Sequence, residues 1–248
     1  MKKIIRYCLF VLVMFLFIRA TCGRPKLSTK PMTGVEIMDY VFFHNVSITF
    51  DGDHYFTLNG GNENYCVVNE YNADRNFIET YDVGLDGRAL FYNPKDKNLY
   101  VKIYGTDLWA IDLYNGTAGV RFSDIFEEDN SSPAFSPDGK CIYELTDGDV
   151  RVIDFKTGEE LERFALESYY DEHGYGLSIA ASKHYLFVWE YEDRVLVYDL
   201  DGEYVTKIKL PRTGYGFSLS YCNGMLWIAE DADASTDGGD GYWYGFEL

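Results

Sequence analysis

Short runs of alternating apolar and polar residues, separated by tight polar turns, repeat along most of this chain. The clearest unit spans residues 135–164, which read FSPDGKCIYELTDGDVRVIDFKTGEELERF. Three runs rich in β-branched and aromatic residues, at 141–143, 150–153 and 161–164, are separated by turn sequences that contain Asp-Gly or Thr-Gly. With Ala134 and Phe135 in front, the pattern predicts one sheet of four antiparallel strands.

A pair of residues, aliphatic or tyrosine followed by aromatic, marks each repeat of this unit. The aromatic members stand 44, 43, 44 and 40 residues apart, and a polar turn precedes each pair. A period in the low forties, with alternation of period two inside it, is typical of four-stranded propeller blades and not of helical repeats. The five pairs are Tyr55-Phe56, Leu99-Tyr100, Ile142-Tyr143, Leu186-Phe187 and Leu226-Trp227.

A second marker is an aspartate at the end of a strand pattern, directly before a turn. Asp112, Asp154 and Asp199 occupy this place, and Asn69 is expected to take it in the first unit. A carboxylate there can accept hydrogen bonds from turn amides. Because the residue recurs with the repeat, we expect a turn-stabilising role and not a catalytic one.

The repeats predict an all-β fold, a single β-propeller domain over residues 35–248. These 214 residues divide into five units of about 43, with six blades as the alternative if a unit is incomplete. The last unit ends after its third strand at 242–248. The alternating run at 35–42 is predicted to supply the fourth strand and close the ring, which removes exposed sheet edges.

The first 22 residues predict an export signal. Lys2, Lys3 and Arg6 precede an eleven-residue apolar run at 8–18, which is too short to span a bilayer as a helix, and small residues follow. Cys22 makes lipidation one route of processing, beside plain cleavage and an uncleaved anchor. Residues 23–34, with two prolines, form a linker. We therefore expect the protein to be exported to the periplasm, the outer membrane or the cell surface, or to be secreted.

The net charge and the cysteines limit which binding partners and which cysteine chemistry we expect. The net charge is −18, and four of the 22 basic residues lie in the export signal, so the remainder is still more acidic. The negative field repels phosphate backbones and anionic lipids, so we do not expect the protein to bind nucleic acid. We expect it to contact a membrane only through the signal or a lipid anchor. Cys66, Cys141 and Cys222 form no CxxC pair and no disulfide framework is expected.

The motif Phe135-Ser136-Pro137-Asp138-Gly139 followed by Ile142-Tyr143 resembles the FSPDG repeat of TolB-like and WD40-like bacterial propellers. The run at 150–160, with V-I-D-x-x-T-G-E, resembles the second half of YVTN and quinoprotein-type repeats. This resemblance implies the propeller fold and is specific only to a superfamily of folds. The tryptophan that closes each quinoprotein blade is missing here, which argues against a quinone cofactor.

Loops between blades, and those between the second and third strand of each blade, should meet on one face around the channel. Arg88, His173, Tyr175 and Tyr215 fall on these loops and are the predicted ligand contacts. Two Gly-Tyr-Gly motifs, 40 residues apart, place Tyr175 and Tyr215 at equivalent points. The tyrosines could stack on a sugar or another flat ligand, or instead pack between blades.

An acidic loop at 231–241 has part of a calcium-binding pattern. Asp231, Asp233 and Asp237 have the first ligand spacings of a calcium loop, but Thr236 and Tyr242 replace its glycine and its bidentate glutamate. The sequence therefore leaves a Ca²⁺ site and a solvated acidic hairpin open. No other cofactor is expected.

Three classes of function remain open. The first is a non-catalytic exported propeller that binds a protein, glycan or small ligand on its loop face. The second is an enzyme, either a glycosidase or lyase with two carboxylates in the channel or a metal-dependent hydrolase. The third is a structural part of a larger envelope assembly. The absence of HExxH, Gly-x-Ser-x-Gly and phosphate-loop motifs favours the first class.

Overall fold

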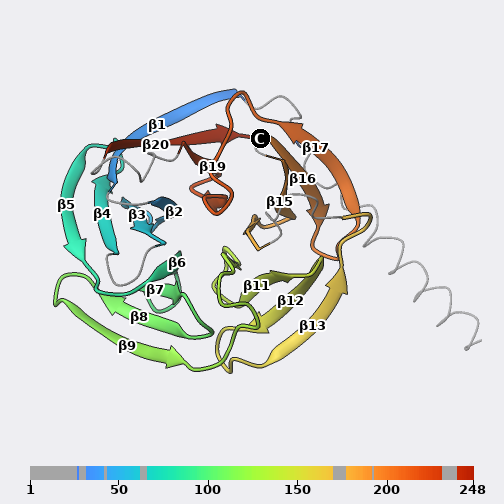
Figure 1. The fold of residues 1–248 in the computed structure, drawn as a ribbon, viewed down its shortest axis with the longest axis horizontal. Helices are drawn as coiled ribbons and strands as arrows, with labels where there is room; N and C mark the ends of the chain where they lie inside the picture. The colour runs from blue at the N-terminus through green and yellow to red at the C-terminus, as the bar shows by residue number, and fades with distance from the viewer. Residues whose placement is uncertain are drawn as a thin grey trace, which may run out of the picture.

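The structure is a computed structural model that describes residue 27 and residues 32–41, 44–61, 66–169, 177–191, 193–230 and 239–248. Within these residues, twenty strands form five antiparallel sheets of four strands each. The sheets surround a common centre, with β2 and β6 near it and β5, β9, β13 and β17 on the periphery (Figure 1). The prediction of an all-β propeller is confirmed, and the number of blades is five.

In blades 1 to 4 the strands follow one another in chain order from the innermost to the outermost, and in blade 5 the three inner strands do so while β1 supplies the outermost strand. Blade 1 contains β2 (His44–Phe50), β3 (His54–Gly60), β4 (Val67–Asn72) and β5 (Phe77–Asp82); blade 2 contains β6 (Gly87–Asn93), β7 (Asn98–Ile103), β8 (Leu108–Asp112) and β9 (Thr117–Phe122); blade 3 contains β10 (Ala134–Phe135), β11 (Cys141–Thr146), β12 (Asp149–Asp154) and β13 (Glu160–Ala165). Blade 4 contains β14 (Ile179–Ala181), β15 (Tyr185–Tyr191), β16 (Arg194–Asp199) and β17 (Tyr204–Lys209); blade 5 contains β18 (Ser220–Cys222), β19 (Met225–Glu230), β20 (Gly239–Glu247) and β1 (Met32–Val41).

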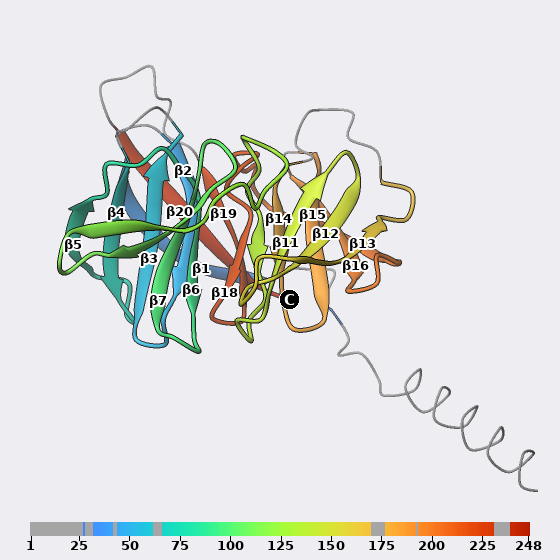
Figure 2. The same ribbon diagram turned by 90° about the horizontal axis from the view of Figure 1, so that it is seen from below.

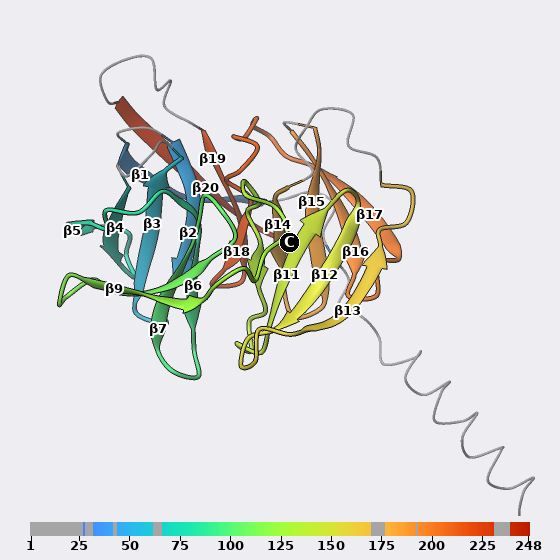
Figure 3. The same ribbon diagram turned by 60° about the horizontal axis from the view of Figure 1, so that its bottom comes forward.

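The two faces of the disc carry different connections. Turns that join each inner strand to its second strand lie along one edge in the side view, whereas the connections between blades lie along the other (Figure 2). The tilted view shows β2 and β6 side by side along the axis (Figure 3). In the part of the chain that the structure describes, no helix is long and apolar enough to cross a membrane.

The paired marker of the repeat explains how neighbouring blades hold together. Successive side chains of a strand point to opposite faces, so one member of each pair packs against the preceding blade and the other against the following blade. Trp227 of blade 5 thus meets Tyr55 of blade 1, with ring centroids 5.5 Å apart. Phe187 of blade 4 similarly shares a cluster with Leu226 of blade 5. Five such clusters fill the five interfaces.

The seam of the ring lies in blade 5, where the two ends of the chain meet. β1 pairs with β20 in antiparallel register, with Ile37 opposite Trp243 and Val35 opposite Gly245. The prediction that the segment after the linker supplies the missing fourth strand is therefore confirmed. Phe42, at the end of the predicted strand, lies outside the described residues.

A buried carboxylate stabilises this seam through hydrogen bonds. The side chain of Asp39 in β1 is 0% exposed, and no cation among the described residues pairs with it. Neutral hydrogen-bond donors surround the carboxylate in place of water. Burial, together with the charge of Asp39, raises the pKa of Tyr71. Its donors are Asn45 Nδ2 (2.9 Å), Asn59 Nδ2 (3.2 Å), Asn69 Nδ2 (2.6 Å), Tyr71 Oη (2.5 Å) and Trp243 Nε1 (3.0 Å).

The recurring aspartates stabilise turns, as the repeat predicts. Asp154 Oδ1 accepts the N–H groups of Lys156 and Thr157, both at 2.8 Å, and Asp112 and Asp199 make equivalent bonds. The prediction for Asn69 is wrong, because Asn72 holds this place and accepts the N–H of Asn76 at 2.9 Å. Asn69 lies three residues earlier, inside β4, where it faces Asp39.

Asp39→Asn tests the seam. The amide keeps the volume but loses the charge and turns a donor toward other donors, so we expect a loss of about 2–4 kcal/mol in the free energy of unfolding. Urea unfolding followed by tryptophan fluorescence measures this loss. Glu36→Gln, on the same strand but exposed, is the matched control and should change stability by less than about 0.5 kcal/mol. Equal stability of the two variants would show that Asp39 does not hold the seam.

Candidate functional site

The central channel contains a cavity of about 330 Å³, lined by residues of all five blades. Its walls are the inner strands β2, β6, β10, β14 and β18, from their middle to their last residues. Its mouth is formed by the turns that follow them, which contain Gly52, Pro94, Pro137 and Gly224. The volume lies at the lower end of the range of roughly 300–1,000 Å³ that is usual for ligand pockets.

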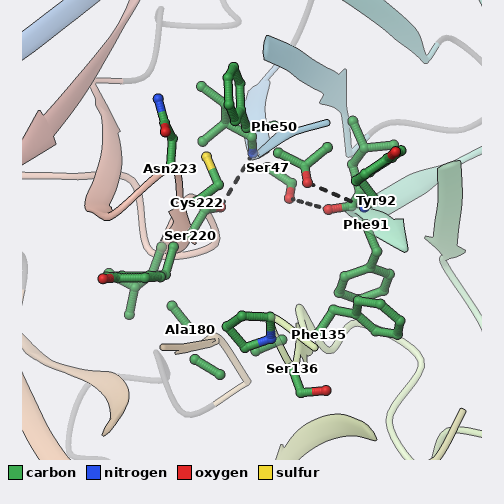
Figure 4. A pocket seen from close by; sticks show the side chains of 18 of the residues that line it. Ser47, Phe50, Phe91, Tyr92, Phe135, Ser136, Ala180, Ser220, Cys222 and Asn223 are labelled. Atoms are coloured by element: carbon green, nitrogen blue, oxygen red, sulfur yellow. Dashed lines mark hydrogen bonds between the residues drawn. The ribbon is translucent and has the colours of Figure 1, made fainter. Parts of the chain in front are cut away.

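Small inner-strand residues create this space. Ala180 and Ala181 line the cavity from blade 4, and Ser47 and Ser220 line it from blades 1 and 5 (Figure 4). Hydroxyl groups bridge neighbouring blades around the wall. Ser220 Oγ accepts the N–H of Ile48 at 3.3 Å, Thr49 Oγ1 accepts the N–H of Tyr92 at 3.2 Å, and Ser47 Oγ donates to the Leu90 carbonyl at 3.4 Å.

Aromatic side chains make up much of the remaining wall. Phe91 and Phe135 lie together on one side, with ring centroids 5.5 Å apart, and Phe50 lies on another side (Figure 4). Tyr221 stacks on Phe187 with 9° between the ring planes. Each ring is thus held by packing, so the cavity is largely preformed.

The lining carries little charge. Among the described residues, no lysine, arginine or histidine lines the cavity, and Asp51 is the one acidic residue of the lining. Asp51 Oδ1 already accepts the N–H groups of Asp53 and His54, at 2.8 and 2.7 Å. Burial raises the pKa of the Tyr92 hydroxyl and of the Cys222 thiol, so both stay neutral near pH 7.

On the predicted loop face, beyond the cavity lining, side chains from different blades contact one another. Tyr215 stacks on His44 with ring centroids 4.8 Å apart, and the centroids of the Tyr215 and Phe217 rings are 5.7 Å apart. Ser132 Oγ donates across the channel, from blade 3 to the Phe217 carbonyl before blade 5, at 3.3 Å. The cavity lining therefore extends to the turn face, and it contains neither Arg88 nor Tyr215.

Arg88 lies on that loop face at the start of β6. Its guanidinium donates to Asp86 Oδ1 at 2.6 Å and to Asn130 Oδ1 at 2.7 Å, and it covers the ring of Tyr104 at 5.0 Å from the centroid. A Cβ atom at Gly61 would lie 3.2 Å from the His44 ring and 3.6 Å from Arg88. The structure therefore brings Arg88 and Tyr215 near one another through His44.

Two buried ionisable side chains, Lys102 and Glu144, hold the loop that contains Asn130. Lys102, which is 0% exposed, donates to the carbonyls of Glu128 and Asp129 at 2.9 and 2.5 Å. Glu144 accepts the N–H groups of Glu127 and Glu128 and binds the Arg151 guanidinium. Burial lowers the pKa of Lys102 to about 7, although the charge of Glu144 opposes this shift.

The other predicted site residues lie outside the described residues. They are His173, Tyr175, Asp231, Asp233, Asp237 and the lipidation candidate Cys22. Within the described ranges, no group of three or more metal-ligating side chains could hold an ion. The roles of these six residues stay predictions.

The cavity itself was not predicted from the sequence, although a signal for it is present. Alanine and serine recur on the inner strands, at Ala134, Ala180, Ala181 and Ser220, where bulkier residues would fill the channel. Fold and cavity together define the class of protein, a five-bladed β-propeller with a ligand-sized cavity in its central channel.

No protein-family model matches the chain, and no curated protein matches it significantly. The resemblance to TolB-like, YVTN and WD40-like repeats therefore identifies the fold and not a family.

Tyr215→Ala should lower the free energy of unfolding by about 1–3 kcal/mol, because it removes a half-buried ring from the stack with His44 and Phe217. Thermal and urea unfolding measure the loss. Tyr114→Ala, at a side chain that is 71% exposed, is the control and should cost less than about 1 kcal/mol. If Tyr215→Ala proves as stable as the wild type, Tyr215 is not a packing residue and its predicted contact role gains support.

Lys102 should make stability rise with pH between 7 and 8.5. The unfolded lysine, with a pKa near 10.5, keeps its proton over this window, whereas the folded one, with a pKa of about 7, loses it. Since the unfolded state then binds more protons, a single group contributes a slope of up to about 1.4 kcal/mol per pH unit. Above pH 8.5 the buried thiols, whose pKa is raised, oppose this slope.

Unfolding curves for wild type and Lys102→Met across this window check the prediction. The variant should lose the slope, and Lys156→Met, at an exposed lysine, should keep it. A slope that survives in Lys102→Met would assign it to other groups.

Proposed function

We propose that this protein is a non-catalytic, exported binding protein that takes a small, electrically neutral ligand in the cavity of its central channel. The observation that carries this proposal is the preformed cavity of about 330 Å³, whose walls come from all five blades. A concave, mostly apolar pocket with a few convergent polar groups is the usual form of a ligand site.

Electrostatics supports a neutral ligand. An anion would enter an acidic protein, of net charge −18, and would find no cationic side chain among the described residues that line the cavity. A cation would find one carboxylate, Asp51, whose Oδ1 already caps a turn. Within the described part of the chain a single carboxylate lines the cavity, which argues against a glycosidase, because that reaction needs a pair of carboxylates across the bound substrate.

Export is supported by the N-terminal pattern of basic residues, a short apolar run and small residues. A protein or glycan contact through Arg88 and Tyr215 on the loop face would be a separate activity, since neither residue lines the cavity.

A thermal-shift panel of neutral, anionic and cationic small molecules tests the function, because a ligand of the folded state raises its apparent stability. We expect neutral compounds alone to raise the melting temperature. Cys222→Trp, which fills the channel from β18, should weaken their binding more than about tenfold. Cys141→Trp, at a cysteine outside the lining, is the matched control and should bind normally. No neutral ligand, or undiminished binding by Cys222→Trp, would exclude the channel as the site.

A further inference from the structure

One residue of each inner strand occupies the same level of the channel. These residues face, on the second strand of their blades, the first members of the five marker pairs. All five line the cavity. They are Phe50, Tyr92, Phe135, Ala181 and Tyr221.

Strand register directs the backbone of these residues into the channel. In an antiparallel ladder, hydrogen-bonded pairs alternate with pairs whose N–H and C=O groups point away from the partner strand. The pairs one step nearer the turn are bonded: Asp51 N–H donates to the His54 carbonyl at 3.1 Å, and Ser136 and Ser182 make the equivalent bonds at 2.8 Å. The backbones of Phe50, Phe135 and Ala181 therefore point toward the axis.

Two bonds to neighbouring blades confirm this direction. Tyr92 N–H, at the same level, reaches Thr49 Oγ1, and Ile48 N–H, two residues before Phe50, reaches Ser220 Oγ. Tyr221, which faces Leu226, occupies the equivalent register position in blade 5.

Four of the five N–H groups at this level are left for a ligand or solvent. Tyr92 N–H is taken by Thr49, but the N–H groups of Phe50, Phe135, Ala181 and Tyr221 have no partner outside their own sheets among the described residues. The hydroxyl hydrogen of Thr49 likewise has no acceptor there. Polar backbone groups that face an enclosed space cost free energy unless they are paired.

The chemistry of this ring of groups selects a ligand class. Each free backbone position offers a donor and an acceptor side by side, and a hydroxyl group both donates and accepts. A hydrocarbon would leave these groups unpaired. Among the described lining residues an anion would find no countercharge, and a cation would find only the carboxylate of Asp51, whose Oδ1 already accepts two turn N–H groups. The aromatic rings of Phe50, Phe91 and Phe135 offer apolar surface to the C–H faces of a compact ring.

We infer that the ligand of the channel is a neutral cyclic polyol, a monosaccharide or a cyclitol, held by the free backbone groups of the inner strands. This inference rests on the proposed function and adds the class of ligand to it.

Amide NMR of the full chain tests the inference with D-glucose, D-galactose, D-mannose, N-acetyl-D-glucosamine and myo-inositol as probes. At least one should shift the amide signals of Phe50, Phe135, Ala181 and Tyr221 and slow their hydrogen exchange at least tenfold, because amides bonded only to water exchange quickly. The amide of Tyr92, already bonded to Thr49, is the internal control and should change little. Cyclohexanol and phenol are the matched rings with a single hydroxyl group.

Thr49→Val removes one hydroxyl at nearly constant volume and should weaken polyol binding about tenfold. Thr117→Val, on the exposed strand β9, should leave it unchanged.

The outcomes separate the two proposals. Binding of phenol or cyclohexanol, blocked by Cys222→Trp, with no polyol bound, would overturn the polyol class and leave the channel function standing. Polyol binding that leaves the four amides unchanged would also overturn this inference. Failure of every neutral probe would remove both.

Discussion

Every blade of this protein has two apolar faces and no second layer of its own. A four-stranded meander of this kind is stable only when a neighbour covers each face. In the ring, each blade is covered by the two blades beside it, and the same residue pattern forms all five interfaces. The marker pair of the second strand sends one side chain to each neighbour, so a single local motif builds all five interfaces. A ring built in this way is complete only when its last interface closes.

Closure depends on β1, which is distant in sequence from the blade that it completes. Asp39 of β1 accepts hydrogen bonds from side chains on three strands of blade 1, β2, β3 and β4, and from the side chain of Trp243 in β20. The carboxylate therefore ties the last blade to the first with directional bonds, where the other interfaces rely mainly on apolar packing. A slip of β1 by one residue would turn the side chain of Asp39 to the other face of the sheet. Its hydrogen bonds would then be lost, so the buried position of Asp39 fixes the register of β1 against β20.

The same closure leaves the inner edges of the blades without a strand partner. Hydroxyl groups of neighbouring blades satisfy some of these backbone groups, at Ile48, Leu90 and Tyr92. Aromatic side chains pack around Tyr215 on the loop face, and alanine and serine on the inner strands leave space for the cavity that reaches the turn face. The candidate binding site is thus a consequence of the architecture: the ring exposes polar backbone at its axis, and the choice of small side chains keeps it accessible.

The sequence by itself determined the strands, their meander order, the period and the strand that closes the ring, because alternation and turn chemistry act over a few residues and repeat. It also determined that Asp112, Asp154 and Asp199 stabilise turns. It misassigned Asn69, because a shift of three residues in a turn cannot be told from composition alone. Only the tertiary structure decided the number of blades, the burial of Asp39 and Lys102, and where along the channel the cavity lies. These depend on contacts between residues up to some two hundred positions apart, and no local pattern encodes which side chains meet at the axis.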